Sequence, residues 1–194
     1  MDFFDKVHER LRDHTRDDIC ARLRSLGIDA QIAERDRTEE RIGCGNRRTY
    51  PFQVDMRSLG LIDIAEGPIR WVNVLRSASS PSSGTVYRTD YGVPDPRLGP
   101  RMTGYIPNLQ IKSVRNVSVL RWKGKDSDRG IINRLNSDIS IKHPIMENRD
   151  VIIRADGYHK CWIIQVETRE VPSKELWNCY QAIADHLLAD WPPA

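Results

Sequence analysis

Three oxygen-bearing side chains in the last third of the chain are the best candidates for chemistry. Asp150 precedes an apolar stretch, and Gln165 and Glu167 close a second one after a short polar turn. Residues two apart on a strand face the same side, so we expect Gln165 and Glu167 to share a face. If the two stretches are neighbouring strands, Asp150 lies at the same sheet end. Asp150 and Glu167 are then predicted to hold Mg²⁺, with Gln165 supporting the metal or the attacking water.

Four cations are candidate contacts to nucleic-acid phosphates. Lys123 and Lys125 lie in a predicted turn, Lys160 lies between the two apolar stretches, and Arg169 follows the second. The net charge of +3 permits binding to nucleic acid without requiring it. DNA or RNA is therefore the expected partner.

Two tryptophans beside arginines have two interpretations. Trp71 follows Arg70 and Trp122 follows Arg121, and aromatic rings beside cations can bind single-stranded nucleic acid. However, adjacent residues on a strand point to opposite faces. We therefore expect both tryptophans in the core and both arginines in water.

Residues 128–190 resemble the PD-(D/E)xK nuclease superfamily, which has the restriction-endonuclease-like fold. Its members carry an acid at a strand start, then a strand that ends in Glu-x-Lys, and then a helix. Asp150 matches the first acid, and the segment 163–169 matches the second strand in hydrophobicity and length. Gln165 stands where the family usually has Glu, and Glu167 where it usually has Lys. The resemblance implies a nuclease-like scaffold and a degenerate Mg²⁺-dependent hydrolase of nucleic acid.

A second hypothesis stays open, because polar side chains at strand ends are common for solubility alone. The protein would then be a non-enzymatic interaction or self-assembling protein. Segment 85–107 and exposed aromatic side chains would bind a protein partner or a second copy. Cleavage of DNA or RNA that depends on Asp150 and Glu167 would separate the two hypotheses.

Hydrophobic periodicity predicts an α+β fold with a central mixed β-sheet, N-terminal helices and a C-terminal amphipathic packing helix. Helices are expected at residues 2–12, 16–26, 128–135 and 173–190, the last capped by Ser173. Strands are expected at 28–34, 61–64, 69–75, within 109–123, at 139–141, and in the two stretches between Asp150 and Glu167. The charged segment 35–48 is expected to be a loop.

The chain divides most naturally at its Pro- and Gly-rich middle. We predict an N-terminal α/β portion at 1–84, a connecting segment at 85–107 and a C-terminal α/β portion at 108–194; the alternative is one continuous domain. No apolar run is long enough to cross a membrane. The four cysteines are scattered without paired spacing, which predicts free thiols and a cytoplasmic location.

Overall fold

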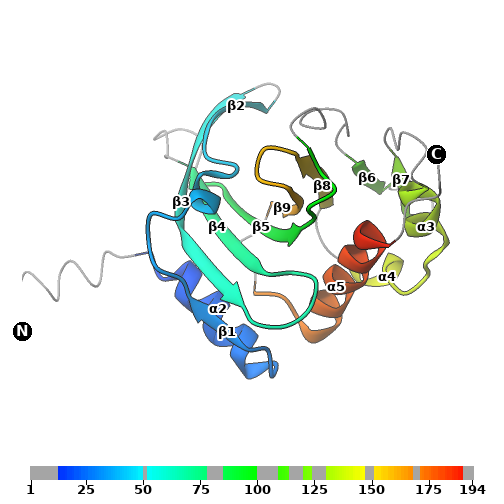
Figure 1. Cartoon of the computed structure of the whole chain (residues 1–194), viewed down its shortest axis with the longest axis horizontal. Helices are drawn as coiled ribbons and strands as arrows, with labels where there is room; N and C mark the ends of the chain where they lie inside the picture. The colour runs from blue at the N-terminus through cyan, green and yellow to red at the C-terminus, as the bar shows by residue number, and fades with distance from the viewer. Residues whose placement is uncertain are drawn as a thin grey trace, which may run out of the picture.

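Nine strands and their flanking helices form one sheet-based structure in the computed structural model (Figure 1). The structure describes residues 13–49, 52–77, 85–99, 109–113, 120–123, 130–146, 151–167 and 171–189. The predicted helix at 2–12 lies outside these ranges, as do Asp150, Lys125 and Arg169. The predicted α+β class is confirmed.

The strands pair in the order β1-β3-β4-β5-β9-β8-β6-β7, and β2 pairs with β3. Their bounds are β1 Ala30–Ile32, β2 Gly45–Thr49, β3 Phe52–Ile64, β4 Trp71–Ser77, β5 Tyr87–Pro94, β6 Leu109–Ser113, β7 Leu120–Lys123, β8 Val151–Asp156 and β9 Cys161–Val166. Every pair among them is antiparallel, so the expectation of a mixed sheet is wrong in this respect. Neighbours in sequence, such as β3 with β4 and β8 with β9, form hairpins, which require antiparallel pairing.

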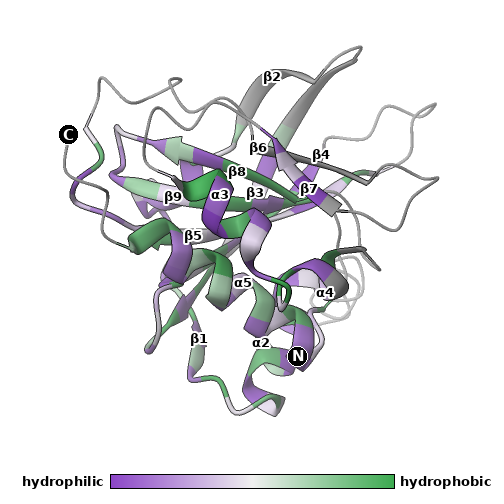
Figure 2. Ribbon diagram, turned by 90° about the vertical axis from the view of Figure 1, so that its right-hand side faces the viewer, coloured by the Kyte–Doolittle hydropathy of each residue, from purple (hydrophilic) through white to green (hydrophobic). Residues whose placement is uncertain are grey.

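One face of the sheet packs on helices, and we call it the helical face. Helices α2 Thr15–Ser25 and α5 Lys174–Leu188 lie on this side, as Figures 1 and 2 show. Their apolar side chains share one core with the inward residues of the central strands. Ser173 caps α5 as predicted, its hydroxyl accepting a hydrogen bond from the Leu176 amide at 3.2 Å. The predicted packing role of this helix is confirmed by the burial of Tyr180 and Ile183.

The opposite face carries the short helix η1 Thr38–Arg41, and we call it the η1 face. Asn73 of β4 holds this segment, because its amide donates to the Glu40 and Ile42 carbonyls at 3.2 and 3.3 Å. A small apolar cluster lies beneath it, formed by Ala33, Ile42, Leu61, Trp71, Cys161 and Ile163. The predicted loop at 35–48 is therefore corrected: it contains η1 and strand β2.

Two other elements differ from expectation. The connecting segment predicted at 85–107 contains strand β5, which lies between β4 and β9 and joins the two predicted portions of the chain into one sheet. The strand predicted at 139–141 is a turn leading into α4 Lys142–Met146. The Asp138 carboxylate accepts from the Ser140 amide at 2.8 Å, a local hydrogen bond that favours the turn. The predicted helix at 128–135 is found as α3 Ile131–Ser137.

Candidate functional site

The β8–β9 hairpin positions the predicted site residues that the structure describes. Val151 pairs with Val166 and Ile152 pairs with Gln165, so β8 begins where β9 ends. The predicted neighbouring strands are therefore confirmed. Gln165 is buried on the η1 face, whereas Glu167, just beyond the strand, is exposed. Asp150 lies outside the described residues, so its convergence with Glu167 stays a prediction.

The described residues do not assemble the predicted metal site by themselves. Among them, no group of three or more His, Cys, Asp or Glu side chains is arranged to hold a metal ion. The buried carboxylate that neighbours Gln165 across the sheet is Asp90, and it is already engaged by an arginine. The described residues alone therefore do not complete a metal site, and Mg²⁺ binding by Asp150 and Glu167 stays a prediction.

The predicted phosphate contacts lie at separate places. Lys160 is exposed in the turn between β8 and β9, at the opposite end of the hairpin from Glu167. Seven residues at about 3.3 Å per residue separate them by roughly 20 Å, too far to act on one reacting phosphate. Lys123 is exposed on β7, a strand near the sheet edge. Lys125 and Arg169 lie outside the described residues.

A buried ion-pair cluster on β5 and β8 lies beside Gln165. Asp90 is fully buried and pairs with Gln165 across the sheet. Arg88 donates to both Asp90 carboxylate oxygens, from Nε at 2.9 Å and from Nη2 at 3.0 Å. Nη2 of Arg88 also donates to the Gly43 carbonyl at 2.9 Å. The Asp90 carboxylate is therefore held in a bidentate pair of the strongest type.

Arg154 of β8 adds a second guanidinium to the same carboxylate. Its Nη2 lies 3.7 Å from Asp90 Oδ2, beyond hydrogen-bond distance, and its side chain is only 14% exposed. Nε and Nη2 of Arg154 are enclosed and make no hydrogen bond. Within the described ranges, no hydrogen bond to the Gln165 side chain is found either. Two cations thus face one buried anion, next to an amide.

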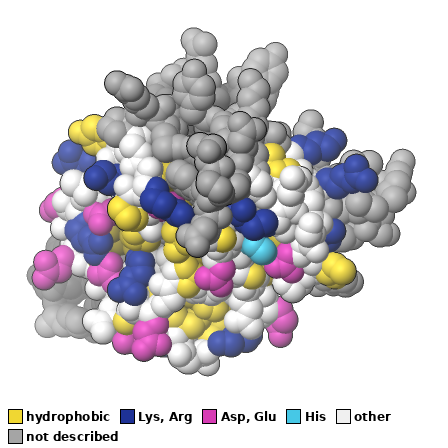
Figure 3. Space-filling view, turned by 45° about the vertical axis from the view of Figure 1, so that its right-hand side comes forward, with side chains coloured by type: hydrophobic (Ala, Val, Ile, Leu, Met, Phe, Trp, Pro, Cys, Tyr) yellow, Lys and Arg dark blue, Asp and Glu magenta, His cyan; other side chains and the backbone are white. Residues whose placement is uncertain are grey.

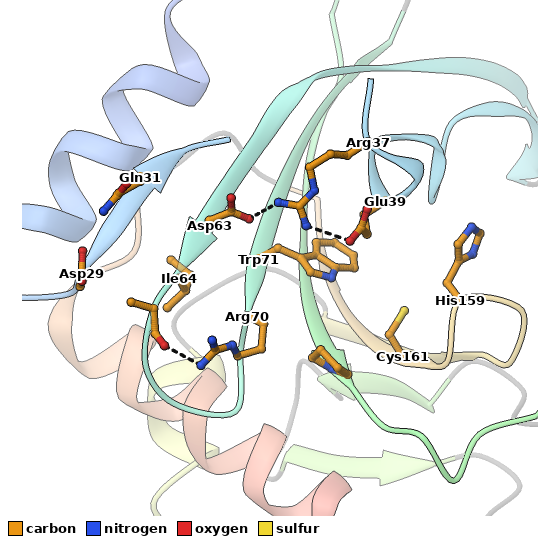
Figure 4. Close-up of a pocket in the computed structure, with 12 residues that line it drawn as sticks. Asp29, Gln31, Arg37, Glu39, Asp63, Ile64, Arg70, Trp71, His159 and Cys161 are labelled. Atoms are coloured by element: carbon orange, nitrogen blue, oxygen red, sulfur yellow. Dashed lines mark hydrogen bonds and ion pairs between the residues drawn. The ribbon is translucent and has the colours of Figure 1, made fainter. Parts of the chain in front are cut away.

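A cavity of about 650 Å³ opens farther along the same face. Figure 4 shows Trp71 at its centre, between Arg37 on one side and Arg70 on the other. Arg37 joins two carboxylates of the lining, donating to Glu39 at 2.8 Å and to Asp63 at 2.5 Å. The hydrogen bond from Arg37 and its positive charge hold the pKa of Glu39 below its usual range. Arg37, Glu39 and Asp63 therefore form an ion-pair network in the lining of the cavity.

His159 enters this cavity from the β8–β9 turn. Its Nδ1 lies 3.2 Å from Asp156 Oδ2, and Asp156 Oδ1 accepts from the amides of Tyr158 and His159 at 3.1 Å each. The amide hydrogen bonds therefore hold the turn, whereas the imidazole Nδ1 makes no hydrogen bond to a described residue. Cys161 also lines the cavity, but burial raises the pKa of its thiol to about 12, so it is not a nucleophile at neutral pH.

The tryptophan prediction is confirmed. Trp71 and Trp122 are 4% and 2% exposed, and Arg70 and Arg121 are exposed. Trp71 lies across Gly92 of the neighbouring strand so closely that a Cβ at Gly92 would overlap its ring. The rings therefore form part of the core and are not stacking platforms for bases.

Sequence reasoning missed Arg88, Asp90 and Arg154, which form the most unusual electrostatic feature described. Arg88 and Asp90 occupy alternate positions of the predicted connecting segment. Alternation in Tyr87–Pro94 was the available signal, since residues two apart on a strand share a face. Their meeting with Arg154 depends on the pairing of β5 with β9, a contact about 75 residues apart in sequence.

On the side drawn in Figure 3, the described residues form no broad basic area. There, Lys and Arg side chains of the described residues alternate with Asp and Glu side chains. No described helix is long and apolar enough to span a membrane. No protein-family model matches the chain, and no curated protein or solved structure matches it.

Proposed function

We propose that this protein binds nucleic acid on the η1 face of its sheet, where β8 begins and β9 ends. One observation carries the proposal: Gln165 shares this face with Arg154 of the neighbouring strand β8, whose Nε and Nη2 make no hydrogen bond to any described residue. Guanidinium and amide groups are the usual donors to phosphate oxygens. Binding would rely on this local site, since the net charge is only +3.

The resemblance to PD-(D/E)xK nucleases also supports this end of the β8–β9 hairpin as the region that contacts nucleic acid. It also suggests phosphodiester hydrolysis with Mg²⁺. Among the described residues, Asp90 is engaged by Arg88, and no group of three or more His, Cys, Asp or Glu side chains is arranged to hold a metal ion. We therefore propose binding as the function and leave hydrolysis to the experiment.

Fluorescence anisotropy with labelled single- and double-stranded DNA and RNA tests the proposal. We expect binding that weakens as salt rises from about 50 to 200 mM, because phosphate contacts release counterions. Gln165→Leu should weaken binding severalfold. Asn178→Leu, the same amide-to-leucine change on the exposed side of α5 across the sheet, is the matched control and should leave binding unchanged. No binding to any of the four nucleic acids would refute the proposal.

The same samples test hydrolysis. The wild-type protein and the variants Asp150→Ala and Glu167→Ala are each incubated with the labelled nucleic acids and Mg²⁺ or Mn²⁺. The products show whether the protein cleaves DNA or RNA. Cleavage that both substitutions abolish would establish a working nuclease. Binding without cleavage would establish a nuclease-like scaffold that only binds.

The protein-interaction alternative has no comparable observation among the described residues. Residues 87–94 of the predicted interaction segment are paired with β4 on one side and β9 on the other, so they offer no free strand edge. Tyr158, 78% exposed at the β8–β9 turn, is an exposed aromatic residue of the kind that hypothesis requires. Size-exclusion chromatography of wild type and Tyr158→Ser would reveal self-assembly through this residue.

A further inference from the structure

The charges around Asp90 do not balance. In the described part of the chain, Asp90 contributes one negative charge, whereas Arg88 and Arg154 contribute two positive charges. Arg88 already donates two hydrogen bonds to Asp90 and one to the Gly43 carbonyl. Arg154 is left with one contact of 3.7 Å. A largely buried guanidinium without hydrogen bonds is costly, which indicates that it has a role beyond stability.

We propose that Arg154 and Gln165 form a binding site for the oxyanion of one phosphate group. This deepens the proposed function, on which it rests only where the oxyanion belongs to a nucleic acid. The ligand supplies the negative charge that the cluster lacks. Gln165, buried and without a hydrogen bond among the described residues, supplies amide donors beside the guanidinium.

The geometry of Arg154 favours an oxyanion over other anions. Its free nitrogens, Nε and Nη2, lie on one edge of the planar guanidinium and present two parallel N–H groups. That edge matches two oxygens of a phosphate, sulfate or carboxylate. Because both nitrogens are enclosed, the guanidinium must turn to meet the ligand. Among the described residues its one ion pair is the 3.7 Å contact to Asp90, so turning breaks no hydrogen bond.

The neighbouring residues explain why Arg154, and not Arg88, would bind the ligand. Asp90 cannot move toward Arg154 without losing its hydrogen bonds to Arg88. The covering backbone is held as well, since a Cβ at Gly43 would overlap the Arg88 guanidinium. Arg88 is thus fixed as the partner of Asp90, and Arg154 remains available to a ligand.

Isothermal titration calorimetry of the full chain with inorganic phosphate, sulfate, acetate and a dinucleotide tests the site. We expect phosphate and sulfate to bind, and Arg154→Met to weaken both at least tenfold. Arg121→Met removes an exposed arginine from β7 and should leave both affinities unchanged. Acetate binding as tight as phosphate binding would identify a carboxylate site and overturn the phosphate assignment. Dinucleotide binding tighter than that of phosphate would show that the phosphodiester is the preferred source of the oxyanion.

Thermal unfolding gives a second readout that does not depend on nucleic acid. Phosphate should raise the melting temperature of wild type and of Arg121→Met, but not of Arg154→Met. If Arg154→Met fails to fold, Gln165→Leu serves as the second variant and should also lose the phosphate effect. The absence of any phosphate or sulfate effect on wild type would overturn the inference.

The outcomes separate this inference from the proposed function. Phosphate binding that requires Arg154, without binding to DNA or RNA, would keep the oxyanion site and reject the proposed function. Nucleic-acid binding that is unaffected by Arg154→Met, without phosphate binding, would keep the proposed function and reject the oxyanion site. Loss of both phosphate binding and nucleic-acid binding in Arg154→Met would show that the oxyanion site is part of the nucleic-acid site.

Discussion

Replacing Arg88 should destabilise the fold far more than replacing Arg154, although both arginines contact the same carboxylate. Arg88→Met leaves the fully buried Asp90 without its bidentate partner and removes the donor to Gly43. Breaking a buried ion pair by removing one partner costs about 3–5 kcal/mol. Arg154→Met breaks no hydrogen bond of the described residues and removes a charge that is costly to bury, so its unfolding free energy should equal or exceed that of wild type.

Urea denaturation followed by tryptophan fluorescence measures the difference. Both variants should keep the wild-type slope, so that a change in midpoint reports stability alone. The double variant Arg88→Met/Asp90→Leu removes the orphaned charge and should recover part of the loss. Equal losses for Arg88→Met and Arg154→Met would refute the charge imbalance and, with it, the reason to expect an oxyanion ligand.

Three further outcomes follow from described contacts. Gly92→Ala places a Cβ against the Trp71 ring and should cost about 1–3 kcal/mol by overpacking, measured by thermal unfolding. Burial alone would raise the pKa of Asp95, but hydrogen bonds from Arg97 and from the Trp162 indole outweigh it and lower the pKa. The folded state therefore holds fewer protons than the unfolded state near pH 4, so this contribution is present above that range and is lost on acidification; Asp95→Asn should flatten stability between about pH 2 and 5. Burial raises the pKa of Cys161 to about 12, so its thiol should react with a thiol reagent at pH 8 only as fast as the protein unfolds.

Local periodicity was enough to predict the elements that carry their own apolar pattern. Helix α5, the β3–β4 hairpin and the β8–β9 hairpin were all expected near their observed positions. Strand β5 was not, because Arg88, Thr89 and Asp90 interrupt the apolar pattern at positions that the fold buries. Polar residues in a central strand are compatible with burial only when their partners come from elsewhere in the chain.

In the candidate site, too, features set by neighbours in the sequence could be predicted, and features set by the pairing of distant strands could not. The shared face of Gln165 and Glu167 follows from the two-residue period of a strand, and the alignment of β8 with β9 follows from a four-residue turn. Arg88 meets Asp90 two residues along the same strand, but Arg154 meets Asp90 only because β9 pairs with both β5 and β8, a register that no local pattern specifies. The sequence therefore indicated where the site lies along β9 but not its neighbours.

The central position of β5 has a consequence for how the chain can be shortened. Strands β1 to β4 precede it and β6 to β9 follow it, and β5 pairs with one member of each group. A fragment that ended after β5 would expose the full hydrogen-bonding edge of an eight-residue strand, and the complementary fragment would expose that of β9. Unprotected edges of this kind recruit other chains. We expect either fragment to aggregate alone and the two, co-expressed, to reassemble by strand complementation.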